Sequence, residues 1–357
     1  MLDLTFYKGR KVFVTGHTGF KGAWLCKILS FAGADVTGYA LEPPTNPNLF
    51  TIADIAKDIN SVIGDIRDYD KLKQVFNAVS PEIVIHMAAQ PLVLESYIQP
   101  KYTYETNVLG TVNILECVRN SSCVKSFLNV TTDKVYLNRD LNNAFEENEQ
   151  LDGFDPYSNS KSCSELVTHC YKNSFFADGK IAVSTARAGN VIGGGDFSEH
   201  RIIPDCVRAV MSGREIVVRN PDSVRPYQHV LEPLFAYLLL TKKQYFTPEL
   251  AGCYNIGPDD CGCISTGQLA DLFCKYWGEK ISWEAAQNVN VLCEAGFLRL
   301  NCDKIKRNLG WKPLLNADEA VKKTVNWTKA WLNGEDIQKE INLQIEEYRE
   351  LFINIAE

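Results

Sequence analysis

The sequence predicts an α/β fold: a doubly wound parallel sheet with a smaller mixed α/β domain. Three observations support it. Strand-like and helix-like segments alternate through the first half, several strands are almost wholly apolar, and the rhythm changes after Gly195. Alternation of this kind favours a parallel sheet with helices on both faces. Strands buried on both faces lose the polar alternation of one-sided sheets, which accounts for the apolar runs.

The expected strands are short runs rich in β-branched residues, at 11–15, 35–39, 61–63, 82–87, 126–131 and 181–186. Helical patterns are expected at 22–32, 69–79, 101–119, 156–173, 317–332 and 337–351. A chain of 357 residues suits one large domain and a smaller one. We expect the first over 1–187, with 226–258 returning to it, and the second over 188–225 and 259–357.

The composition excludes several classes of protein. With 45% hydrophobic and 23% charged residues the chain is ordinary for a globular protein. A net charge of -7 argues against nucleic acid or an anionic membrane as partner. We see no targeting segment and no apolar run of bilayer length, so a cytoplasmic protein is expected.

Cysteine is frequent, with 12 residues, but the cysteines are scattered singly. The tightest group is Cys253, Cys261 and Cys263, which lacks paired Cys-x-x-Cys knuckles and a nearby histidine. We therefore expect reduced thiols and no metal.

A glycine-rich turn follows the first expected strand and precedes the first helix. In this setting glycines allow backbone N–H groups to approach a pyrophosphate at the helix N-terminus. The turn predicts a Rossmann-type dinucleotide site formed by Gly16, His17, Thr18, Gly19, Phe20, Lys21 and Gly22. We expect His17 to be a solvated loop residue, and Lys21 either to assist phosphate binding or to be solvated.

The second strand lacks the acidic residue that normally binds the adenosine ribose. It runs into Ala40 and Leu41, and the first carboxylate, Glu42, comes late. No arginine stands there to bind a 2′-phosphate. The pattern predicts NAD rather than NADP, held loosely.

A second motif opens the expected helix at 156–173. Asp155 suits the N-cap and Pro156 the first helical position. Tyr157 and Lys161, four residues apart, then lie one turn apart on one face. A nearby ammonium lowers the pKa of a phenol, so we expect Tyr157 to act as a base on a substrate hydroxyl.

Upstream, the expected strand at 126–131 runs into Thr131-Thr132-Asp133-Lys134. With the glycine turn and the Tyr-x-x-x-Lys pair, this segment resembles the extended short-chain dehydrogenase/reductase family, and more narrowly its nucleotide-sugar 4,6-dehydratases. The resemblance covers nearly the whole chain. It includes the segments Gln-Pro-Leu-Val at 90–93, Arg-Ala-Gly-Asn-Val-Ile-Gly-Gly-Gly-Asp at 187–196 and Arg-Pro-Tyr-Gln-His-Val-Leu-Glu-Pro at 225–233.

The resemblance implies a catalytic set of Thr132, Asp133, Lys134, Tyr157 and Lys161. Thr132 binds the sugar 4-hydroxyl, Tyr157 removes its proton, and hydride passes from C4 to NAD. Water is then lost across C5 and C6 with Asp133 as acid, and the hydride returns to C6. Lys134 stands where most 4,6-dehydratases have Glu. This variant is similar to the CDP-glucose branch, which implies conversion of CDP-D-glucose to CDP-4-keto-6-deoxy-D-glucose.

Lys134 as the C5 base poses a difficulty. A lysine pKa near 10.4 must drop by about three units, or roughly 4 kcal/mol, to be half neutral near pH 7.5. Alternatively, Lys134 stays charged and stabilises the enolate electrostatically. We favour the base slightly.

The resemblance also assigns ligand contacts. Cofactor contacts beyond the glycine turn are expected from Asp65, Ile66, Ala88, Ala89, Gln90, Asn107, Thr131, Tyr157 and Lys161, with Asn107 mainly structural. Substrate contacts are expected from Asn190, Arg201, Ile202 and Arg225, since guanidinium groups suit the diphosphate. Leu94 stands where the family commonly has Arg, which makes the nucleotide preference less secure than the chemistry.

Other interpretations stay open. The chain could be a nucleotide-sugar epimerase or reductase, a dehydratase of another NDP-glucose, or a NAD-sensing regulatory protein without turnover. Asp133-Lys134 speaks against an epimerase, and the intact Thr132, Tyr157 and Lys161 against a sensor. The family also implies a dimer formed through the helices at 102–118 and 157–171, so we expect a homodimer or a dimer of dimers.

Overall fold

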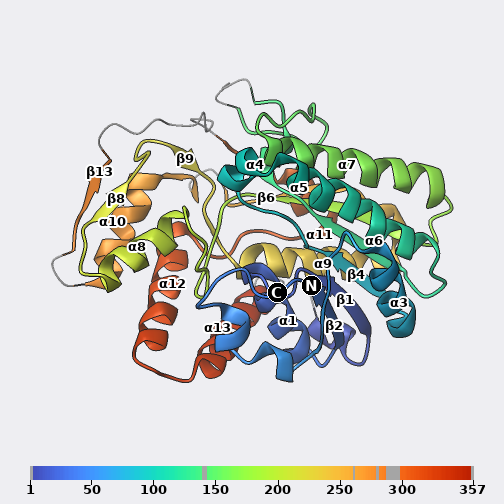
Figure 1. The fold of residues 1–357 in the computed structure, drawn as a ribbon, viewed down its shortest axis with the longest axis horizontal. Coiled ribbons are helices and arrows are strands. Elements are labelled where there is room, and N and C mark those ends of the chain that lie inside the picture. The colour runs from blue at the N-terminus through green and yellow to red at the C-terminus, as the bar shows by residue number, and fades with distance from the viewer. Residues whose placement is uncertain (1–2, 139–142, 260–261, 279–280, 287–297, 355–357) are drawn as a thin grey trace.

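The computed structural model describes residues 3–138, 143–259, 262–278, 281–286 and 298–354. It confirms the expected α/β class, with a large body built on a parallel sheet and a smaller lobe beside it (Figure 1). The lobe, at the left of Figure 1, contains α8, α10, β8 and β13.

Seven parallel strands form the central sheet, in the order β11-β6-β5-β4-β1-β2-β3. The chain order reverses between β1 and β4, and in open α/β sheets ligands bind beyond the carboxyl ends of the strands at such a point. The strands are β1 (Lys11–Thr15), β2 (Asp35–Ala40), β3 (Asn60–Ile63), β4 (Ile83–His86), β5 (Ser126–Val130), β6 (Ala182–Ala188) and β11 (Cys253–Ile256).

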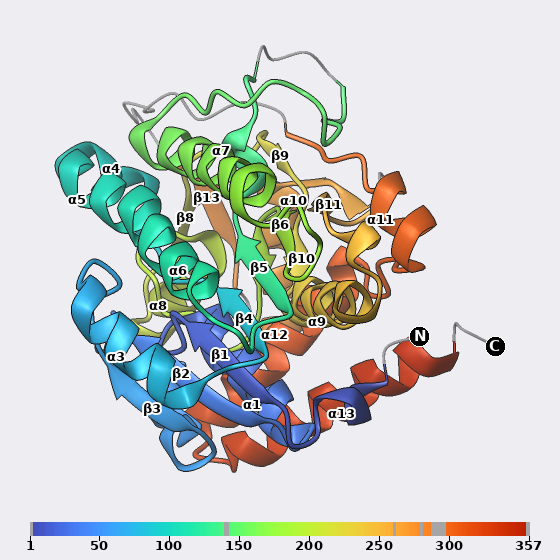
Figure 2. The same ribbon diagram turned by 90° about the vertical axis from the view of Figure 1, so that its right-hand side faces the viewer.

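Helices cover both faces of the sheet, as Figure 2 shows end-on. On one face α3 (Tyr69–Val79), α6 (Gly110–Arg119) and α7 (Pro156–Phe175) share a core with alternate strand residues such as Phe13 and Phe127. On the other face, α1 (Phe20–Phe31), α9 (Leu231–Phe246) and α13 (Ile337–Asn354) pack on the intervening residues, such as Val12, Val14 and Ile85.

The expected strands and helices lie within a few residues of those observed, with two exceptions. The helix expected at 101–119 is divided into α5 (Pro100–Tyr104), the π-helical turn η3 (Glu105–Leu109) and α6. The edge strand β11 was not expected, because it is short and follows α9, far from the alternating pattern of the first half. The remaining small elements of the body are η1 (Leu4–Tyr7), α2 (Leu49–Ile52), η2 (Ile55–Lys57), α4 (Val93–Ile98), η4 (Asp133–Val135) and η5 (Pro248–Leu250).

The smaller lobe has its own core, in which Ile203, Val207, Leu269, Phe273 and Val321 are buried together. Three two-stranded pairs join its chain segments: β7 with β10, β9 with β12, and β8 with β13. Its elements are β7 (Val191–Ile192), α8 (Ile202–Met211), β8 (Ile216–Val218), β9 (Val224–Arg225), β10 (Gln228–His229), β12 (Ile264–Ser265), α10 (Thr266–Trp277), β13 (Trp283–Ala285) and α12 (Ala317–Leu332).

The C-terminal helices divide between the two cores. Residues of α11 (Asp303–Leu309) and α13 are buried in the core of the body, including Ile305, Ile341 and Tyr348. Among the described residues 298–354, only those of α12, such as Val321, belong to the core of the lobe. The sequence pattern predicted that all of 259–357 belongs to the second domain. We propose instead that α11 and α13 belong to the first.

The glycine run at 193–195 joins body and lobe. Trp24 Nε1 of α1 donates to the Gly194 carbonyl at 2.9 Å. A Cβ on Gly194 would lie 2.0 Å from Trp327 Cγ of α12, and Gly195 combines a φ of +84° with a contact to Leu49. Side chains from α1, α2 and α12 therefore converge here, and the glycines are required by close packing.

Candidate active site

The glycine loop, residues 16–22, connects β1 to α1 at the carboxyl edge of the sheet. Gly16 has a φ of +81°, and a Cβ there would lie 2.8 Å from Ala88 N. A Cβ on Gly22 would lie 2.1 Å from the Gly16 carbonyl oxygen, so these two positions accept only glycine. Gly19, the N-cap of α1, has no atom within 3.4 Å of such a Cβ. The open space over a helix N-terminus fits a pyrophosphate.

His17 does not lie in solvent, and the expectation that it does is wrong. Its side chain is fully buried, with Nε2 2.7 Å from Ser61 Oγ and the ring edge-on to Phe50. Gly38 of β2 makes room for it, because a Cβ there would lie 2.3 Å from His17 Cγ. Burial lowers the pKa of His17 to about 4, so it is neutral and structural.

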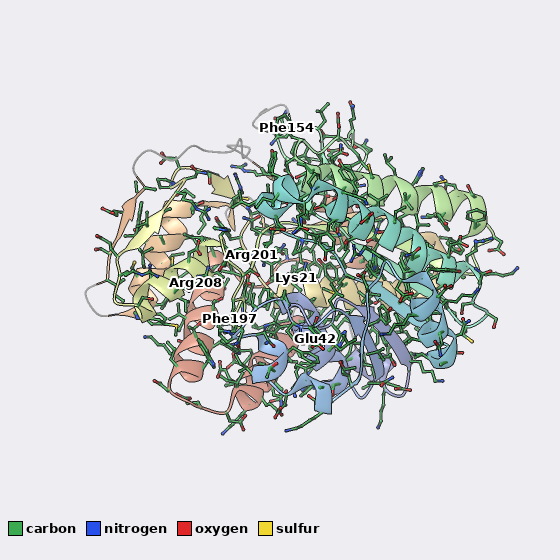
Figure 3. The ribbon with its side chains drawn as sticks, viewed as in Figure 1. Lys21, Glu42, Phe154, Phe197, Arg201 and Arg208 are labelled. Atoms are coloured by element: carbon green, nitrogen blue, oxygen red, sulfur yellow. The ribbon has the colours of Figure 1, made fainter. Side chains whose placement is uncertain are left out.

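Lys21 lies beside Arg201 in Figure 3, between body and lobe. Its Nζ donates to Tyr237 OH of α9 at 2.9 Å. Burial and, with it, the charges of Lys161 and Arg201 lower the pKa of Lys21 to about 7, while Asp133 opposes them. Lys21 is therefore a half-buried group of the active site and is not a solvated residue.

Two residues expected near the adenine, Asp65 and Ile66, follow β3. The Asp65 carboxylate binds Arg67 through Nε and Nη2, and this pairing holds the pKa of Asp65 below its usual range. The Ile66 side chain is buried against Gly110 of α6. Asp65 can thus still accept a hydrogen bond from a ligand, whereas Ile66 can offer only its main chain.

Asn107 lies in the π-helical turn η3 and joins three segments. Its Oδ1 accepts from Gln90 N at 2.8 Å, while Nδ2 donates to the Gln90 carbonyl and to Ser160 Oγ of α7. Ala88 N, just after β4, donates to Thr15 Oγ1. These bonds fix the chain that contains Ala88, Ala89 and Gln90 beside the glycine loop, so Asn107 acts on the protein rather than on a ligand.

The catalytic turn, residues 131–135, follows β5. Thr132 is the N-cap of η4, and its Oγ1 donates to Asp133 Oδ1 at 3.0 Å. Asp133 is 1% exposed, and its Oδ2 is buried without a partner among the described residues. Lys134 Nζ lies 3.9 Å from Asp133 Oδ1. The turn thus presents a hydroxyl, a carboxylate oxygen and an ammonium together. Thr131 donates instead to Glu165, behind the site.

Tyr157 and Lys161 begin α7, which is capped by Asp155 through Ser158 N at 3.0 Å and has Pro156 in its first turn. Tyr157 hydrogen-bonds with Thr132, so the two motifs meet. Lys161 is 4% exposed and donates to the Val130 carbonyl at 3.2 Å.

The pKa of Tyr157 is raised to about 12, although its neighbourhood was expected to lower it. Burial is the main cause and Asp133 adds to it, while the bond to Thr132 and the charge of Arg201 act in the other direction. Burial also lowers the pKa of Lys161 to about 8. Desolvation therefore outweighs the attraction between the phenolate and its cationic surroundings.

Arg201 reaches the site from the lobe, as the N-cap of α8. Its Nη1 lies 2.8 Å from Asp196 Oδ2, and this pairing raises its pKa. Arg208 stabilises the same loop by donating to the carbonyls of Phe197 and Ser198 (Figure 3). Arg201 is thus a fixed cation that faces Tyr157 across the boundary between body and lobe.

The other expected substrate contacts lie in the lobe or at its edge. Arg225 of β9 is 3% exposed, and its Nη1 donates to the Val224 carbonyl. Asn190 is half-buried and its carbonyl accepts from Gln228 N, while Ile202 is half-buried at the start of α8. Leu94 is half-buried in α4.

The sequence patterns missed three site residues. Asp196, which pairs with Arg201, lies in the segment 187–196 that supports the family resemblance, but the resemblance assigned no role to it. Tyr237 lies in an apolar helix, where no pattern marks it. Glu165 follows Lys161 by one helical turn, so the spacing of Tyr157, Lys161 and Glu165 could have placed it on the same face of α7.

Within the described ranges, no three or more histidine, cysteine or acidic residues are arranged to hold a metal ion. Cys261, one of the three cysteines considered for zinc, lies outside those ranges. No helix in the described part of the chain is long and apolar enough to cross a membrane.

Three comparisons place the chain among known proteins. The family model GDP-mannose 4,6 dehydratase matches residues 13–324. The CDP-glucose 4,6-dehydratase of Salmonella typhimurium is 45% identical over 343 residues, covering 94% of this chain and 95% of that protein. Human dTDP-D-glucose 4,6-dehydratase is 28% identical over 344 residues, covering 91% and 93%.

Solved structures show the same fold at low identity. An epimerase from Methanothermobacter thermautotrophicus superposes with a TM-score of 0.79 at 22% identity, covering 94% of this chain and 96% of that one. The dTDP-glucose 4,6-dehydratase of Bacillus anthracis, solved with NAD, gives 0.72 at 21% identity, covering 90% and 97%. The chain therefore belongs to the GDP-mannose 4,6-dehydratase family of extended short-chain dehydrogenase/reductase proteins.

Proposed function

We propose that this chain is a NAD-dependent lyase that converts CDP-D-glucose to CDP-4-keto-6-deoxy-D-glucose. One observation supports it most: the buried carboxyl of Asp133 contacts the Thr132 hydroxyl and the Lys134 ammonium through Oδ1, while its Oδ2 has no partner among the described residues. Oxidation at C4 alone needs Thr132, Tyr157 and Lys161. An added carboxyl and amine suit the loss of water across C5 and C6, and the 45% identical relative has this activity in its name.

NAD fits the residues of the carboxyl edge. The glycine loop offers the N-terminus of α1 for the pyrophosphate, and the free space over Gly19 leaves room for it. Asp65, the main chain of Ile66 and the segment 88–90 are proposed for the adenine and ribose side. When bound, NAD would accept a hydride from C4 of the sugar and return it to C6.

In the first step, Thr132 orients the sugar 4-hydroxyl and Tyr157 takes its proton. Tyr157 needs help, because burial raises its pKa to about 12. Arg201, which lowers the Tyr157 pKa by its charge, and the Lys161 ammonium one turn away both favour the phenolate. Lys161 is also placed to bind the cofactor ribose.

In the second step, the ketone at C4 acidifies the C5 proton and the C6 hydroxyl leaves as water. Asp133 is proposed to donate a proton to this hydroxyl through its unpartnered oxygen. Lys134 either removes the C5 proton as a neutral amine or, as an ammonium, stabilises the negative charge of the enolate. Return of the hydride to C6 together with a proton to C5 would complete the reaction with no net redox change.

Arg201 and Arg225 are proposed to bind the diphosphate, with Asn190 and Ile202 beside them. Arg201 is fixed by Asp196 and carries a guanidinium fork that suits phosphate oxygens. The acidic chain, with a net charge of -7, needs such local cations to attract a dianion.

The test is an assay with CDP-, dTDP-, UDP- and GDP-glucose in the presence of NAD. We expect a product lighter by one water from CDP-glucose, without accumulation of NADH. A product of unchanged mass would indicate an epimerase, stoichiometric NADH a dehydrogenase, and no turnover a sensor. Each of these outcomes rejects the proposal.

The role of Lys134 needs a separate measurement. In deuterated buffer, Lys134→Met is expected to abolish exchange of the C5 hydrogen if Lys134 is the base. Normal exchange with slow overall turnover would assign Lys134 to electrostatic stabilisation.

We further propose a homodimer formed through the outer faces of α5, α6 and α7. Large apolar side chains are exposed on α5, on the turn η3 that joins it to α6, and on α7, at Tyr104, Leu109, Leu166 and Phe175. A Leu109→Glu/Leu166→Glu variant is expected to sediment as a monomer while the wild type sediments as a dimer or larger species.

Buried free thiols such as Cys26, Cys117 and Cys206 suit a reducing compartment, and we propose that the enzyme is cytoplasmic.

A further inference from the structure

A buried carboxylate lies behind the catalytic residues, one turn beyond Lys161 on α7. Glu165 is 2% exposed, and each of its oxygens accepts two hydrogen bonds. Oε1 accepts from Thr131 Oγ1 and from Arg187 Nε, while Oε2 accepts from Thr185 Oγ1 at 2.7 Å and from Arg187 Nη2 at 2.9 Å. The ionised carboxylate is the form that accepts all four bonds.

The donors come from the strands beneath α7, which Figure 2 shows lying over β5 and β6. Thr131 follows β5 directly, next to Thr132, and both Thr185 and Arg187 belong to β6. Arg187 also donates to Tyr136 OH at 2.8 Å and to the Glu147 carbonyl at 3.0 Å. These bonds hold the Glu165 side chain of α7 against β6 and against the end of β5, where the catalytic turn begins.

A cation and a neutral imidazole are among the neighbours of Lys161. Lys161 acts on Lys21 of α1 as a like charge, and His86 of β4 is neutral because burial lowers its pKa to about 3. Tyr157, one turn earlier, has its pKa raised to about 12. Asp133 acts on Lys21 and Tyr157, whereas the anion that acts on Lys161 is Glu165.

We propose that Glu165, fixed by Arg187, is a positioning residue that keeps the buried Lys161 protonated in the active site. The inference rests on the proposed function, since a charged Lys161 matters there for the acidity of Tyr157 and for the ribose contact. Burial lowers the pKa of Lys161 to about 8, and Glu165 opposes that effect. Without Glu165, the pKa of Lys161 is therefore expected to fall further, so that a smaller fraction of Lys161 is protonated near pH 7.5.

The test uses Glu165→Gln, with Thr185→Val as the matched control. The control removes one hydrogen bond to the carboxylate but leaves its charge. Glu165→Gln leaves the Arg187 guanidinium in the core without its anion, so a Glu165→Gln/Arg187→Met variant is studied in parallel. The pKa of Lys161 is measured by NMR with 13Cε-labelled lysine, its signal assigned by Lys161→Met.

We expect the Lys161 pKa to fall by about one unit or more in both variants and to stay at its wild-type value in Thr185→Val. Turnover at pH 7.5 falls about threefold, in proportion to the protonated fraction, and recovers at pH 6. An unchanged Lys161 pKa in either folded Glu165 variant would overturn the inference. The NMR titration needs no turnover, so an inactive wild type would reject the proposed function and leave this test intact.

Discussion

The glycine loop and the catalytic turn lie side by side at the carboxyl edge of one sheet, yet different forces hold them. The glycine loop is determined by shape, because Gly16 and Gly22 approach backbone atoms too closely for any side chain. The catalytic turn is determined by charge and hydrogen bonding, through Thr132, Asp133 and the pair Glu165–Arg187. We propose that the glycine loop binds a ligand common to many enzymes and that the catalytic turn carries the chemistry. Substitutions should therefore damage the first sterically and the second electrostatically.

The largest effect is expected in the catalytic turn. Tyr157→Phe removes the proposed base without changing the shape of α7, and turnover is expected to fall about 10³-fold. The thermal midpoint and the Kd for NAD should change little, which isothermal titration can check. A loss of less than about tenfold would show that another group removes the proton.

In the glycine loop the effect should be on stability. Gly22→Ala places a Cβ 2.1 Å from the Gly16 carbonyl oxygen, and we expect a loss of about 3 kcal/mol or more in the free energy of unfolding. Gly19→Ala is the matched control, because its Cβ meets no atom within 3.4 Å. The control should unfold like the wild type and bind NAD more weakly. Equal stability of the two variants would contradict the steric account.

The third prediction concerns Glu232, a buried carboxyl outside the active site, whose removal should stabilise the protein rather than destabilise it. Glu232 accepts from Leu314 N, Leu315 N and Tyr348 OH, and burial raises its pKa from 4.5 to about 7. The folded state thus favours the protonated form of Glu232. The contribution of Glu232 to the free energy of unfolding is therefore lost as pH rises from about 4.5 to about 7. By pH 8 the ionised Glu232 carboxylate lowers the free energy of unfolding by about 3 kcal/mol, which corresponds to the rise of about 2.5 in its pKa on folding.

Glu232→Gln should therefore be more stable than the wild type at pH 8 by about 2 to 3 kcal/mol, and similar to it below pH 5. Chemical denaturation at the two pH values measures this difference. Glu346→Gln, exposed on α13, should show no such pH dependence. If Glu232→Gln is the less stable protein at pH 8, the hydrogen bonds of the carboxylate outweigh its desolvation.

The smallest effect is expected in the loop that positions Arg201. Arg208→Met removes the hydrogen bonds to the carbonyls of Phe197 and Ser198 and the ion pair with Asp205. The KM for the nucleotide sugar should rise about threefold to tenfold with kcat unchanged, because binding rather than chemistry is affected. Arg214→Met, an exposed arginine after α8, should leave both constants as they are. A change in kcat would place Arg208 in the chemistry.

Local patterns predicted most of the body. β1 and α3 begin and end where their apolar periodicities do, and Asp155 caps α7 as its side chain allows. The π-helical turn at Glu105–Leu109 escaped, because an extra residue in a helical turn leaves the apolar spacing almost unchanged. The edge strand β11 escaped as well, since it follows α9 and lies outside the alternating pattern that marked the equally short β3 and β4.

The sequence by itself determined the class of sheet, the glycine loop and the Tyr157–Lys161 spacing, because each depends on residues close together in the chain. Only the tertiary structure decided that His17 is buried behind Gly38, that Lys21 reaches Tyr237, and that the Tyr157 pKa is raised. Burial and charge at a site depend on residues far apart in the chain, such as Glu165 and Arg187, and these meet only once the sheet and its helices have packed.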